Sequence, residues 1–462
     1  MKKKFLLILL IITCNTICNT TSSAIQPAYK IAVIGTGYVG LITGVCLAEF
    51  GHTVICIDND QKKIDALKTG HVPIFEPDLD ALLARLSHTD HLSFTTDFDT
   101  AVSTSDIIFI AVGTPMGEDG YADLSAVYAV FDQIIPHLTT YKLICVKSTV
   151  PIGTGQGLIE KLQNNSVDER FYDVVSNPEF LREGSAVHDF FHPDRIIIGT
   201  ESEKACTIMK EVYAPLIESH IPCFFTDISS SETIKYASNA FLATKLSFIN
   251  EISNLCDQTG ADIQDVAYGM GLDKRIGPAF LKPGPGFGGS CFPKDCNALC
   301  SIGARYGVPL FLVETALKIN AEQKKKPVEK LSTLMNEPLT DKTVAILGLA
   351  FKNNTDDIRY SPAIDTIEIL LEEGAHIKAY DPHATNNMRK LFPSIEYQSS
   401  AYDALYQADA CIIMTEWEEF KTLDLGYMTN IMKSCILVDT RNLLNPAELL
   451  QYNFKYAMMG RS

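Results

Sequence analysis

The sequence predicts an α/β protein in which two doubly wound parallel sheets are joined by a long central helical segment. Short runs rich in Val and Ile alternate with helix-length segments twice along the chain, and a stretch without Gly or Pro separates the two series. Runs that are apolar throughout are typical of parallel strands, because helices bury both faces of such a sheet. At 462 residues the chain is long enough for two or three domains.

The alternation divides the chain into domains at residues 29–228, 229–326 and 327–462. In the first we expect strands at residues 30–35, 53–58, 106–112, 143–148, 173–176 and 195–199. The middle segment begins with Ser229-Ser230-Ser231-Glu232, a plausible helix cap, and is interrupted near residues 307–309. Long helices between α/β domains more often join and dimerise them than perform chemistry. In the last domain we expect strands at 343–348, 376–380, 410–414 and 436–439.

The two α/β series begin alike. An apolar run ends at Gly35 in the first and at Gly348 in the second, and the following strands end at Asp58 and Asp381. The second series lacks a GxGxxG sequence, so any nucleotide it binds must be held differently.

Composition excludes several classes of protein. The 39 Lys and Arg residues are outnumbered by 56 Asp and Glu, a net charge of −17, which argues against a nucleic-acid-binding protein. Anionic ligands would have to be held by helix N-termini, glycine-loop amides and a few placed cations. The 46% hydrophobic content is typical of a globular protein and excludes a disordered chain.

Residues 1–28 have the form of a secretory signal, with basic residues, an apolar run and small residues before Ile25. The apolar run is too short to span a membrane. The segment is either an export signal or the product of a start codon upstream of the true one. The odd count of 13 cysteines without a CxxC pair indicates reduced thiols. We therefore favour the second interpretation and expect a cytoplasmic protein.

A dinucleotide-binding sequence follows the first strand. Gly35-Thr36-Gly37-Tyr38-Val39-Gly40 closes an apolar run and opens a helix, so its glycines allow a tight turn, close approach of a pyrophosphate and helix–strand packing. Asp58 ends the next strand, where a carboxylate accepts ribose hydroxyls and repels the 2′-phosphate of NADP. The pattern predicts a Rossmann-like domain that binds NAD.

Polar residues follow other strands or share a helix face. Thr114 and Thr149 come after strands, where they either contact a ligand or serve as turn residues. Glu179 and Glu183, four apart, could share one helical face as acid/base groups, and Lys235 and Asn239, also four apart, could bind an oxyanion. Taken alone, the two glutamates are more simply explained as surface charges, and Lys235 and Asn239 as part of an exposed helix face.

The glycine-rich segment 284–290 indicates a loop that wraps closely around a ligand. Cys291 follows it beside Lys294 and Asp295, where a helix is expected to begin. A cation and a helix N-terminus both lower the pKa of a thiol, so Cys291 is a candidate nucleophile. The spacing of Cys291, Cys296 and Cys300 fits no metal cluster, and we expect no metal.

Long motifs in residues 30–450 resemble those of the UDP-glucose/GDP-mannose dehydrogenase family of nucleotide-sugar dehydrogenases. They are GTGYVG, VGTP, STVPIGT, NPEFLREG, KYASNAFLATKLSFINE, DKRIGPAFLKPGPGFGGSCFPKD and GLAFKNNTDDIRYSPA, in that order. The resemblance implies Cys291 as nucleophile, with Lys235, Asn239, Asp295, Glu179 and Thr149 as further catalytic residues. The leader is not part of the family's pattern.

The resemblance also implies two sets of binding residues. At the cofactor it places Gly35, Gly37, Tyr38, Val39, Gly40, Asp58, Lys63, Thr114, Thr149, Glu183, Lys294 and Arg359. At the nucleotide-sugar it places Glu179, Phe180, Leu181, Arg182, Glu183, Lys235, Asn239, Arg275, Phe280, Leu281, Lys282, Pro283, Gly284, Gly288 and Lys352, with Arg275 contributed across a dimer interface.

The activity implied by the resemblance is the four-electron oxidation of UDP-glucose to UDP-glucuronate with two NAD, through a thiohemiacetal and a thioester on Cys291. Three alternatives stay open. One is a sister enzyme acting on GDP-mannose or a UDP-N-acetylhexosamine, one is a two-electron 3-hydroxyacid dehydrogenase that needs no cysteine, and one is a nucleotide-binding protein without turnover.

Overall fold

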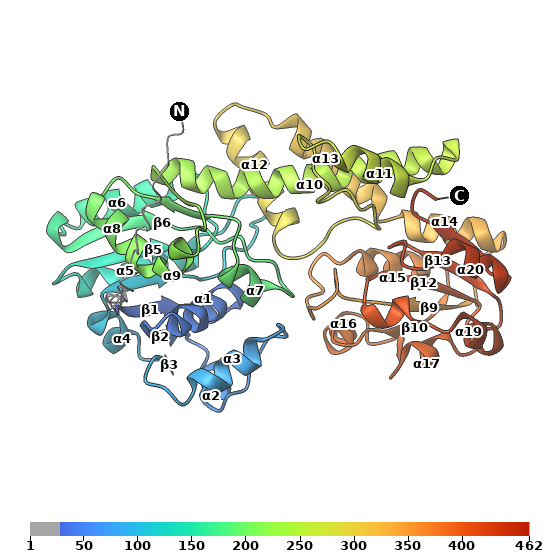
Figure 1. The fold of residues 1–462 in the computed structure, drawn as a ribbon, viewed down its shortest axis with the longest axis horizontal. Coiled ribbons are helices and arrows are strands. Elements are labelled where there is room, and N and C mark those ends of the chain that lie inside the picture. The colour runs from blue at the N-terminus through green and yellow to red at the C-terminus, as the bar shows by residue number, and fades with distance from the viewer. Residues whose placement is uncertain (1–27, 462) are drawn as a thin grey trace, which may run out of the picture.

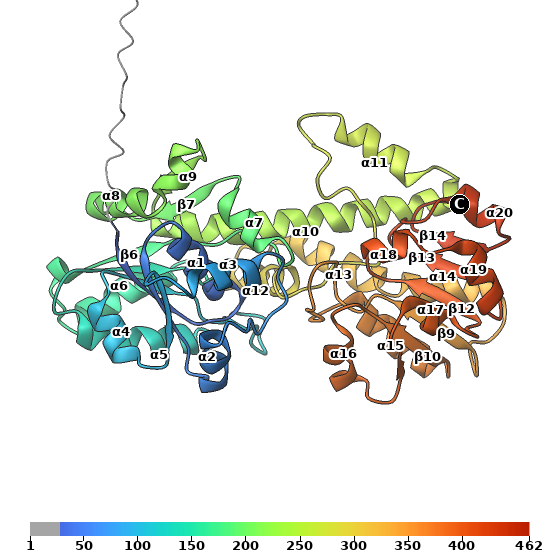
Figure 2. The same cartoon turned by 60° about the horizontal axis from the view of Figure 1, so that its bottom comes forward.

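The computed structural model describes residues 28–461 and shows two α/β units that flank a long helix, α10 (Ile228–Thr259) (Figure 1). The leader expected at residues 1–28 lies outside the described residues, apart from Ala28. Helix α10 runs along both units, and α11 (Ile263–Gly271) lies above α10 in the view of Figure 2, where Ile263 N donates to Gly460 O at 2.9 Å. The predicted fold class, two Rossmann-like sheets with a helical segment between them, is confirmed.

The N-terminal sheet has the order β3-β2-β1-β4-β5-β6-β7-β8, and its first six strands follow the order of a dinucleotide-binding fold. All expected strands are present. The edge strands β3 and β8 were not expected, because they are only partly buried and lack a continuous apolar run. The strands are β1 (Lys30–Ile34), β2 (Thr53–Ile57), β3 (Leu92–Thr95), β4 (Ile107–Ile110), β5 (Lys142–Val146), β6 (Tyr172–Ser176), β7 (Ile196–Gly199) and β8 (Cys223–Thr226).

One strand direction differs from the expectation. Strand β7 is antiparallel to β6, which it meets at the single pair Ser176 and Gly199. The connection, residues 177–195, stays beyond the carboxyl end of β6, so β7 runs back toward that end. This connection therefore lies at the edge of the sheet where ligands of α/β proteins bind.

Both faces of the N-terminal sheet are covered. Along β1, Ile31 and Val33 belong to one apolar cluster and Ala32 and Ile34 to another, as the period-two alternation of a strand requires. The helices of this unit are α1 (Tyr38–Glu49), α2 (Gln61–Lys68), α3 (Leu79–Leu86), α4 (Phe98–Thr104), α5 (Ser125–Ile134), α6 (Thr154–Asn164), α7 (Ala186–Phe191), α8 (Glu203–Val212) and α9 (Ala214–Glu218).

The central segment is helical and interrupted as predicted. Its helices after α11 are α12 (Phe292–Arg305), α13 (Phe311–Gln323) and α14 (Lys326–Met335). The predicted cap of α10 was wrong. Asp227 caps the helix by accepting from the backbone N–H of Ser230, whereas Glu232 accepts from Gly153 N at 2.6 Å and Gly155 N at 2.8 Å. Glu232 thereby joins α10 to the start of α6.

The C-terminal sheet has the order β11-β10-β9-β12-β13-β14 and is parallel throughout. Its strands are β9 (Thr343–Leu347), β10 (His376–Tyr380), β11 (Glu396–Tyr397), β12 (Ala410–Ile413), β13 (Ile436–Asp439) and β14 (Lys455–Met458). Its helices are α15 (Pro362–Glu372), α16 (Thr385–Leu391), α17 (Ala401–Leu405), α18 (Glu418–Lys421), α19 (Leu425–Ile431) and α20 (Pro446–Gln451).

The C-terminal end of the chain returns to the central helices. Gly460 N donates to Asp257 Oδ1 on α10 at 3.0 Å, and Arg461 Nε donates to Asp262 Oδ2 at 2.9 Å. Lys330 on α14 pairs with the same Asp257 at 2.6 Å. The far end of α10 is thus held by the C-terminal unit. Within residues 28–461, none of the helices combines the length and apolar character that a membrane crossing requires.

Candidate active site

The loop after β1 has the shape that a dinucleotide needs. A Cβ at Gly35 would lie 2.6 Å from Ala111 O, and one at Gly40 would lie 1.8 Å from Gly35 O, so both positions require glycine for packing. Gly37, which precedes α1, has no atom within 4 Å of its Cβ position. The middle glycine therefore leaves space at a helix N-terminus, where a pyrophosphate binds.

Asp58 follows β2 beside this loop. Its Oδ2 accepts from Thr36 N at 2.9 Å and Thr36 Oγ1 at 2.7 Å, and Lys63 Nζ lies 3.6 Å away. Burial opposes ionisation, but the N–H groups of Asp60 and Thr36, the Thr36 hydroxyl and Lys63 outweigh it, so the pKa of Asp58 is lowered. A carboxylate that stays ionised here fits a ribose diol and repels a 2′-phosphate.

Other residues expected at the cofactor surround the same edge of the sheet. Thr114 Oγ1 donates to Thr149 O at 2.8 Å, which ties together the loops after β4 and β5. Tyr38 reaches across to accept from Gly184 N at 2.8 Å, and Val39 packs against the apolar core. Their side chains therefore contact protein, and their backbone lies at the start of α1.

Lys235 and Asn239 project from one face of α10, as their spacing predicts, and both are buried. Lys235 Nζ pairs with Glu179 Oε1 at 3.0 Å, and Asn239 Nδ2 donates to Asp295 Oδ2 at 2.6 Å. Lys294 Nζ pairs with the other oxygen of Asp295 at 2.5 Å. The alternative of an exposed helix face is therefore wrong for Lys235 and Asn239.

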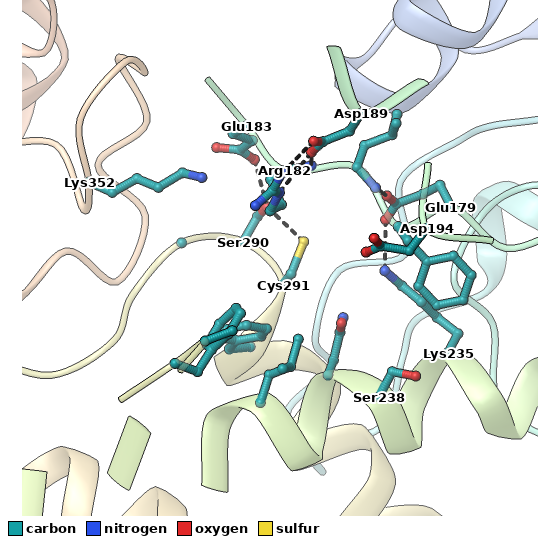
Figure 3. A pocket seen from close by; sticks show the side chains of 18 of the residues that line it. Glu179, Arg182, Glu183, Asp189, Asp194, Lys235, Ser238, Ser290, Cys291 and Lys352 are labelled. Carbon is teal, nitrogen blue, oxygen red and sulfur yellow. Dashed lines mark hydrogen bonds and ion pairs between the residues drawn. The ribbon is translucent and has the colours of Figure 1, made fainter. Parts of the chain in front are cut away.

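Glu179 and Glu183 do not share a helical face, because residues 177–182 are irregular. They lie on opposite sides of Cys291 (Figure 3). Glu179 pairs with Lys235, whereas Glu183 accepts from Ser290 Oγ at 3.0 Å and pairs with Arg359 at 3.3 Å. The geometry therefore gives the reactive sulfur a different carboxylate on each side.

Cys291 directly precedes α12, as expected, but its thiol is not activated in the way the sequence indicated. Burial and the negative charge of Glu179 raise its pKa to about 11, and Lys235 only partly opposes them. Lys294, the cation expected to help, is engaged by Asp295. The thiol therefore requires a proton acceptor before it can act as a nucleophile.

Behind Glu179 lies a buried lysine that the sequence analysis missed. Lys147 Nζ donates to Asn177 Oδ1 at 3.1 Å and to Tyr213 OH at 3.3 Å. Burial lowers the pKa of Lys147 to about 8, although the charge of Glu179 opposes this. Lys147 therefore holds the residue two positions before Glu179 and adds positive charge beside the Lys235–Glu179 pair.

A cavity of about 890 Å³ joins these groups to the C-terminal unit. Of the residues expected at the nucleotide-sugar it is lined by Glu179, Phe180, Leu181, Arg182, Glu183, Lys235, Asn239, Phe280, Lys282, Gly284, Gly288 and Lys352. Leu281 instead packs in an apolar cluster with α10 and α11, and Pro283 is absent from the lining. Arg275 pairs with Asp273 and is exposed on the surface.

Arg441, which also lines the cavity, was not found from the sequence. It follows β13, donates from Nε to Met414 O at 2.8 Å and pairs with Glu416 at 3.0 Å. A Cβ at Gly284 would lie 3.2 Å from Arg441 Nη1. The rule that ligands bind at the carboxyl ends of parallel strands, applied to the second sheet, would have identified Arg441.

The second sheet does not repeat the cofactor site. Asp381, the counterpart of Asp58, is buried and accepts from the backbone N–H groups of Leu349 and Ala350, from His383 N and Ala384 N, and from Trp417 Nε1. Asp381 is only 2% exposed, against 9% for Asp58, and its two oxygens accept five hydrogen bonds from the protein, so this carboxylate is not presented to a ribose.

Three models of one family cover most of the chain. The NAD binding, central and UDP binding domains of the UDP-glucose/GDP-mannose dehydrogenase family match residues 29–217, 229–322 and 345–446. The chain belongs to the UDP-glucose/GDP-mannose dehydrogenase family. It is therefore an NAD-dependent dehydrogenase, and the loop around Gly37 with Asp58 lies within its NAD-binding domain.

Individual members of the family are similar over nearly their whole length. The UDP-glucose 6-dehydrogenase of Rhizobium meliloti (strain 1021) is 48% identical over 94% of this chain and 99% of that protein. The UDP-glucose dehydrogenase structure from Pyrobaculum islandicum has a TM-score of 0.87 at 35% identity, covering 95% of this chain and 99% of that one. The UDP-D-ManNAc dehydrogenase structure from Pyrococcus horikoshii has a TM-score of 0.82 at 26% identity, covering 93% of this chain and 99% of that one.

No group of three or more His, Cys, Asp or Glu side chains in residues 28–461 is arranged to hold a metal ion.

Proposed function

We propose that the protein oxidises C6 of the glucose moiety of UDP-glucose to a carboxylate, giving UDP-glucuronate through intermediates bound to Cys291. The observation that carries this proposal is the position of the Cys291 thiol between two carboxylates, in a cavity that also meets Lys235, Asn239 and the C-terminal unit. A two-electron oxidation of an alcohol needs no nucleophile, whereas carrying an aldehyde on to an acid without releasing it does. The R. meliloti relative supports UDP-glucose as the substrate.

The residues have separable tasks in this reaction. The loop around Gly37 and the Asp58 carboxylate would hold NAD, which would supply the hydride acceptor for both oxidations of C6. The Cys291 thiolate adds to the aldehyde from the first oxidation, and Lys235 and Asn239 stabilise the resulting oxyanion. After the second oxidation, Asp295 and Glu179 hold the water that hydrolyses the thioester. Thr149 follows β5, and its backbone oxygen accepts from Thr114 Oγ1 at 2.8 Å, so we assign these two loops to the positioning of the cofactor.

The substrate has two phosphates, and the cavity offers cations despite the chain's net charge of −17. Lys282, Lys352 and Arg441 line the part of the cavity that the C-terminal unit forms with the glycine loop. We assign these cations to the diphosphate, the loop 280–288 to the nucleotide, and residues 179–183 to the sugar. Burial lowers the pKa of Lys352, although the charge of Glu183 opposes this, so a bound phosphate would stabilise its charged form.

We propose that the enzyme is a homodimer or a higher homo-oligomer. Phe241, Phe248 and Leu255 are exposed and lie seven residues apart on α10, so they form one apolar stripe. Tyr268 on α11 is also exposed, and Arg275 follows that helix. A second copy packed on the stripe would cover it and present Arg275 to the partner's cavity. A solution mass equal to one chain by light scattering would exclude this assembly.

A cytoplasmic location is proposed for the same enzyme. Every cysteine in residues 28–461 is a free thiol, which supports a reducing compartment. Recovery of the protein from the periplasmic or secreted fraction would contradict this location.

The decisive measurement is the number of NADH molecules formed per UDP-glucose consumed, with Cys291→Ser alongside. Two NADH per sugar, with turnover lowered about 10³-fold or more in Cys291→Ser, supports the thioester route. One NADH per sugar, independent of Cys291, would move the protein to the two-electron class. UDP-N-acetylmannosamine should be measured in parallel, because the P. horikoshii structure makes a sister activity the next candidate. Preference for that sugar would overturn the assignment of UDP-glucose.

A further inference from the structure

Ser290 links the reactive thiol to the carboxylate of Glu183. Its Oγ lies 3.6 Å from Cys291 Sγ and donates to Glu183 Oε1 at 3.0 Å, so one hydroxyl contacts both groups (Figure 3). No other side chain within residues 28–461 forms a hydrogen bond to this sulfur. The loop places Ser290 here because Gly289 N donates to Arg359 O at 2.8 Å, which holds the backbone against the C-terminal unit.

The direction of these two hydrogen bonds follows from the chemistry of a hydroxyl. Ser290 has one proton, and an ionised Glu183 can only accept it. The lone pairs of Ser290 Oγ then face Cys291, so the thiol is the donor of the second hydrogen bond. The chain of atoms is S–H, O–H and carboxylate, in the order that proton transfer requires.

The other ionisable groups around the sulfur are engaged elsewhere. Glu179 accepts from Lys235 Nζ on one oxygen and from Leu181 N on the other. The charge of Glu179 raises the pKa of Lys235 against the effect of burial, and Lys235 pairs with Glu179, so this lysine holds its own proton. Asp295 accepts from Asn239 on one oxygen and from Lys294 on the other.

Glu183, in contrast, has an oxygen to spare. It faces Asp357, Arg359 and Lys352, and its Oε2 is buried and accepts no hydrogen bond from the described residues.

We propose that Ser290 relays the proton of the Cys291 thiol to Glu183, an inference that rests on the proposed function. As the bond from Sγ to the C6 aldehyde forms, the S–H bond breaks and its proton moves to Ser290 Oγ. The original hydroxyl proton moves from Ser290 to Glu183 Oε1 in the same step. No electrons are exchanged with the relay, and the reverse transfer restores the thiol after hydrolysis.

Glu183 can accept this proton when the pH is near or above its raised pKa. Burial and the negative charge of Asp357 raise its pKa to about 8, although Arg359 and Ser290 oppose them. A general base works best when its pKa lies near the operating pH. Because Glu183 must be ionised to accept the proton, the reactivity of Cys291 should rise as pH increases through about 8.

The test measures thiol reactivity without either substrate. The full-length protein is treated with iodoacetamide between pH 6 and pH 10, and alkylation of the peptide containing Cys291 is followed by mass spectrometry. We expect Ser290→Ala and Glu183→Gln each to slow alkylation at pH 8 by about 100-fold, a typical contribution of a positioned base. Ser290→Thr keeps the hydroxyl and should stay within about threefold of wild type. The control Ser301→Ala changes a serine elsewhere on α12.

The variants separate a relay from a loss of packing. In the double variant Ser290→Ala/Glu183→Gln, alkylation should be no slower than in either single variant, because both substitutions interrupt the same proton path. An unchanged pH profile in Ser290→Ala would overturn the relay. If alkylation is slow in Ser290→Ala but normal in Glu183→Gln, Glu183 is not the acceptor. If alkylation is also slow in Ser290→Thr, the loss comes from packing and not from the hydroxyl. Since alkylation needs neither NAD nor UDP-glucose, these outcomes are independent of the NADH stoichiometry that tests the proposed function.

Discussion

Replacing Gly288 by alanine should separate the cysteine loop from the C-terminal unit. A Cβ at Gly288 would lie 2.3 Å from Tyr360 O, whereas an ordinary van der Waals contact begins at 3.4 Å, so one backbone must move by about 1 Å. Tyr360 cannot easily yield, because its φ of 53° already lies in the left-handed region. Cys291 follows three residues later and would be displaced with the loop. A misplacement of this size typically costs about 100-fold in rate.

The assay is steady-state NADH formation with UDP-glucose varied at saturating NAD. We expect kcat/KM for UDP-glucose to fall by about 100-fold in Gly288→Ala. The matched control is Gly157→Ala on α6, where no atom lies within 4 Å of the Cβ position, and its activity should stay within about twofold. A folded Gly288→Ala enzyme with kcat/KM within about threefold of wild type would refute the argument that this contact positions Cys291.

Two further predictions concern stability. Glu232→Ala leaves the N–H groups of Gly153 and Gly155 without their acceptor, which should lower the free energy of unfolding by about 1–3 kcal/mol for each group. The apparent Tm in a thermal melt should therefore fall by about 5 °C or more. An unchanged Tm would contradict this prediction. Lys147→Met should raise the apparent Tm at pH 7, because it removes a buried charge. It should also lower kcat, because it removes the positive charge beside the Lys235–Glu179 pair. Burial lowers the pKa of Lys147 from 10.5 in the unfolded chain to about 8 in the folded one. Below pH 8 the charged lysine therefore destabilises the folded state by about 3 kcal/mol, and this destabilisation disappears as pH rises from 8 toward 10.5. The difference in Tm should therefore shrink above pH 8, and a gap that stays constant to pH 10 would show that the charge is not its cause.

Most of the fold was predictable because the strands buried on both faces are continuous apolar runs. Strands β1 and β9 are examples, and the shared positions of Gly35 and Gly348 at their ends indicated the repeated architecture. Strands β3 and β8 were missed because one side of each is solvated and the run is broken. The reversed direction of β7 has no local signal, since it depends on where the preceding loop lies.

The candidate site was only partly predictable, because motifs identify residues without placing them. The four-residue spacing of Lys235 and Asn239 predicted one helix face, and that face is buried at the cavity. The same spacing failed for Glu179 and Glu183, where irregular backbone separates the two carboxylates. The raised pKa of Cys291 could not be foreseen, because it arises from burial among segments distant in sequence.

The anchoring of α10 near both of its ends has a geometric consequence. Glu232 fixes the helix to α6, and Asp257 is held by the C-terminal unit. At 1.5 Å per residue along the helix, Asp257 lies roughly 38 Å from Glu232, whereas Lys235 lies only about 4.5 Å from it. A tilt of about 3° would move Asp257 by roughly 2 Å but Lys235 by only about 0.2 Å. A tilt of α10 about Glu232 would therefore move Lys235 far less than the end of the helix that the C-terminal unit holds.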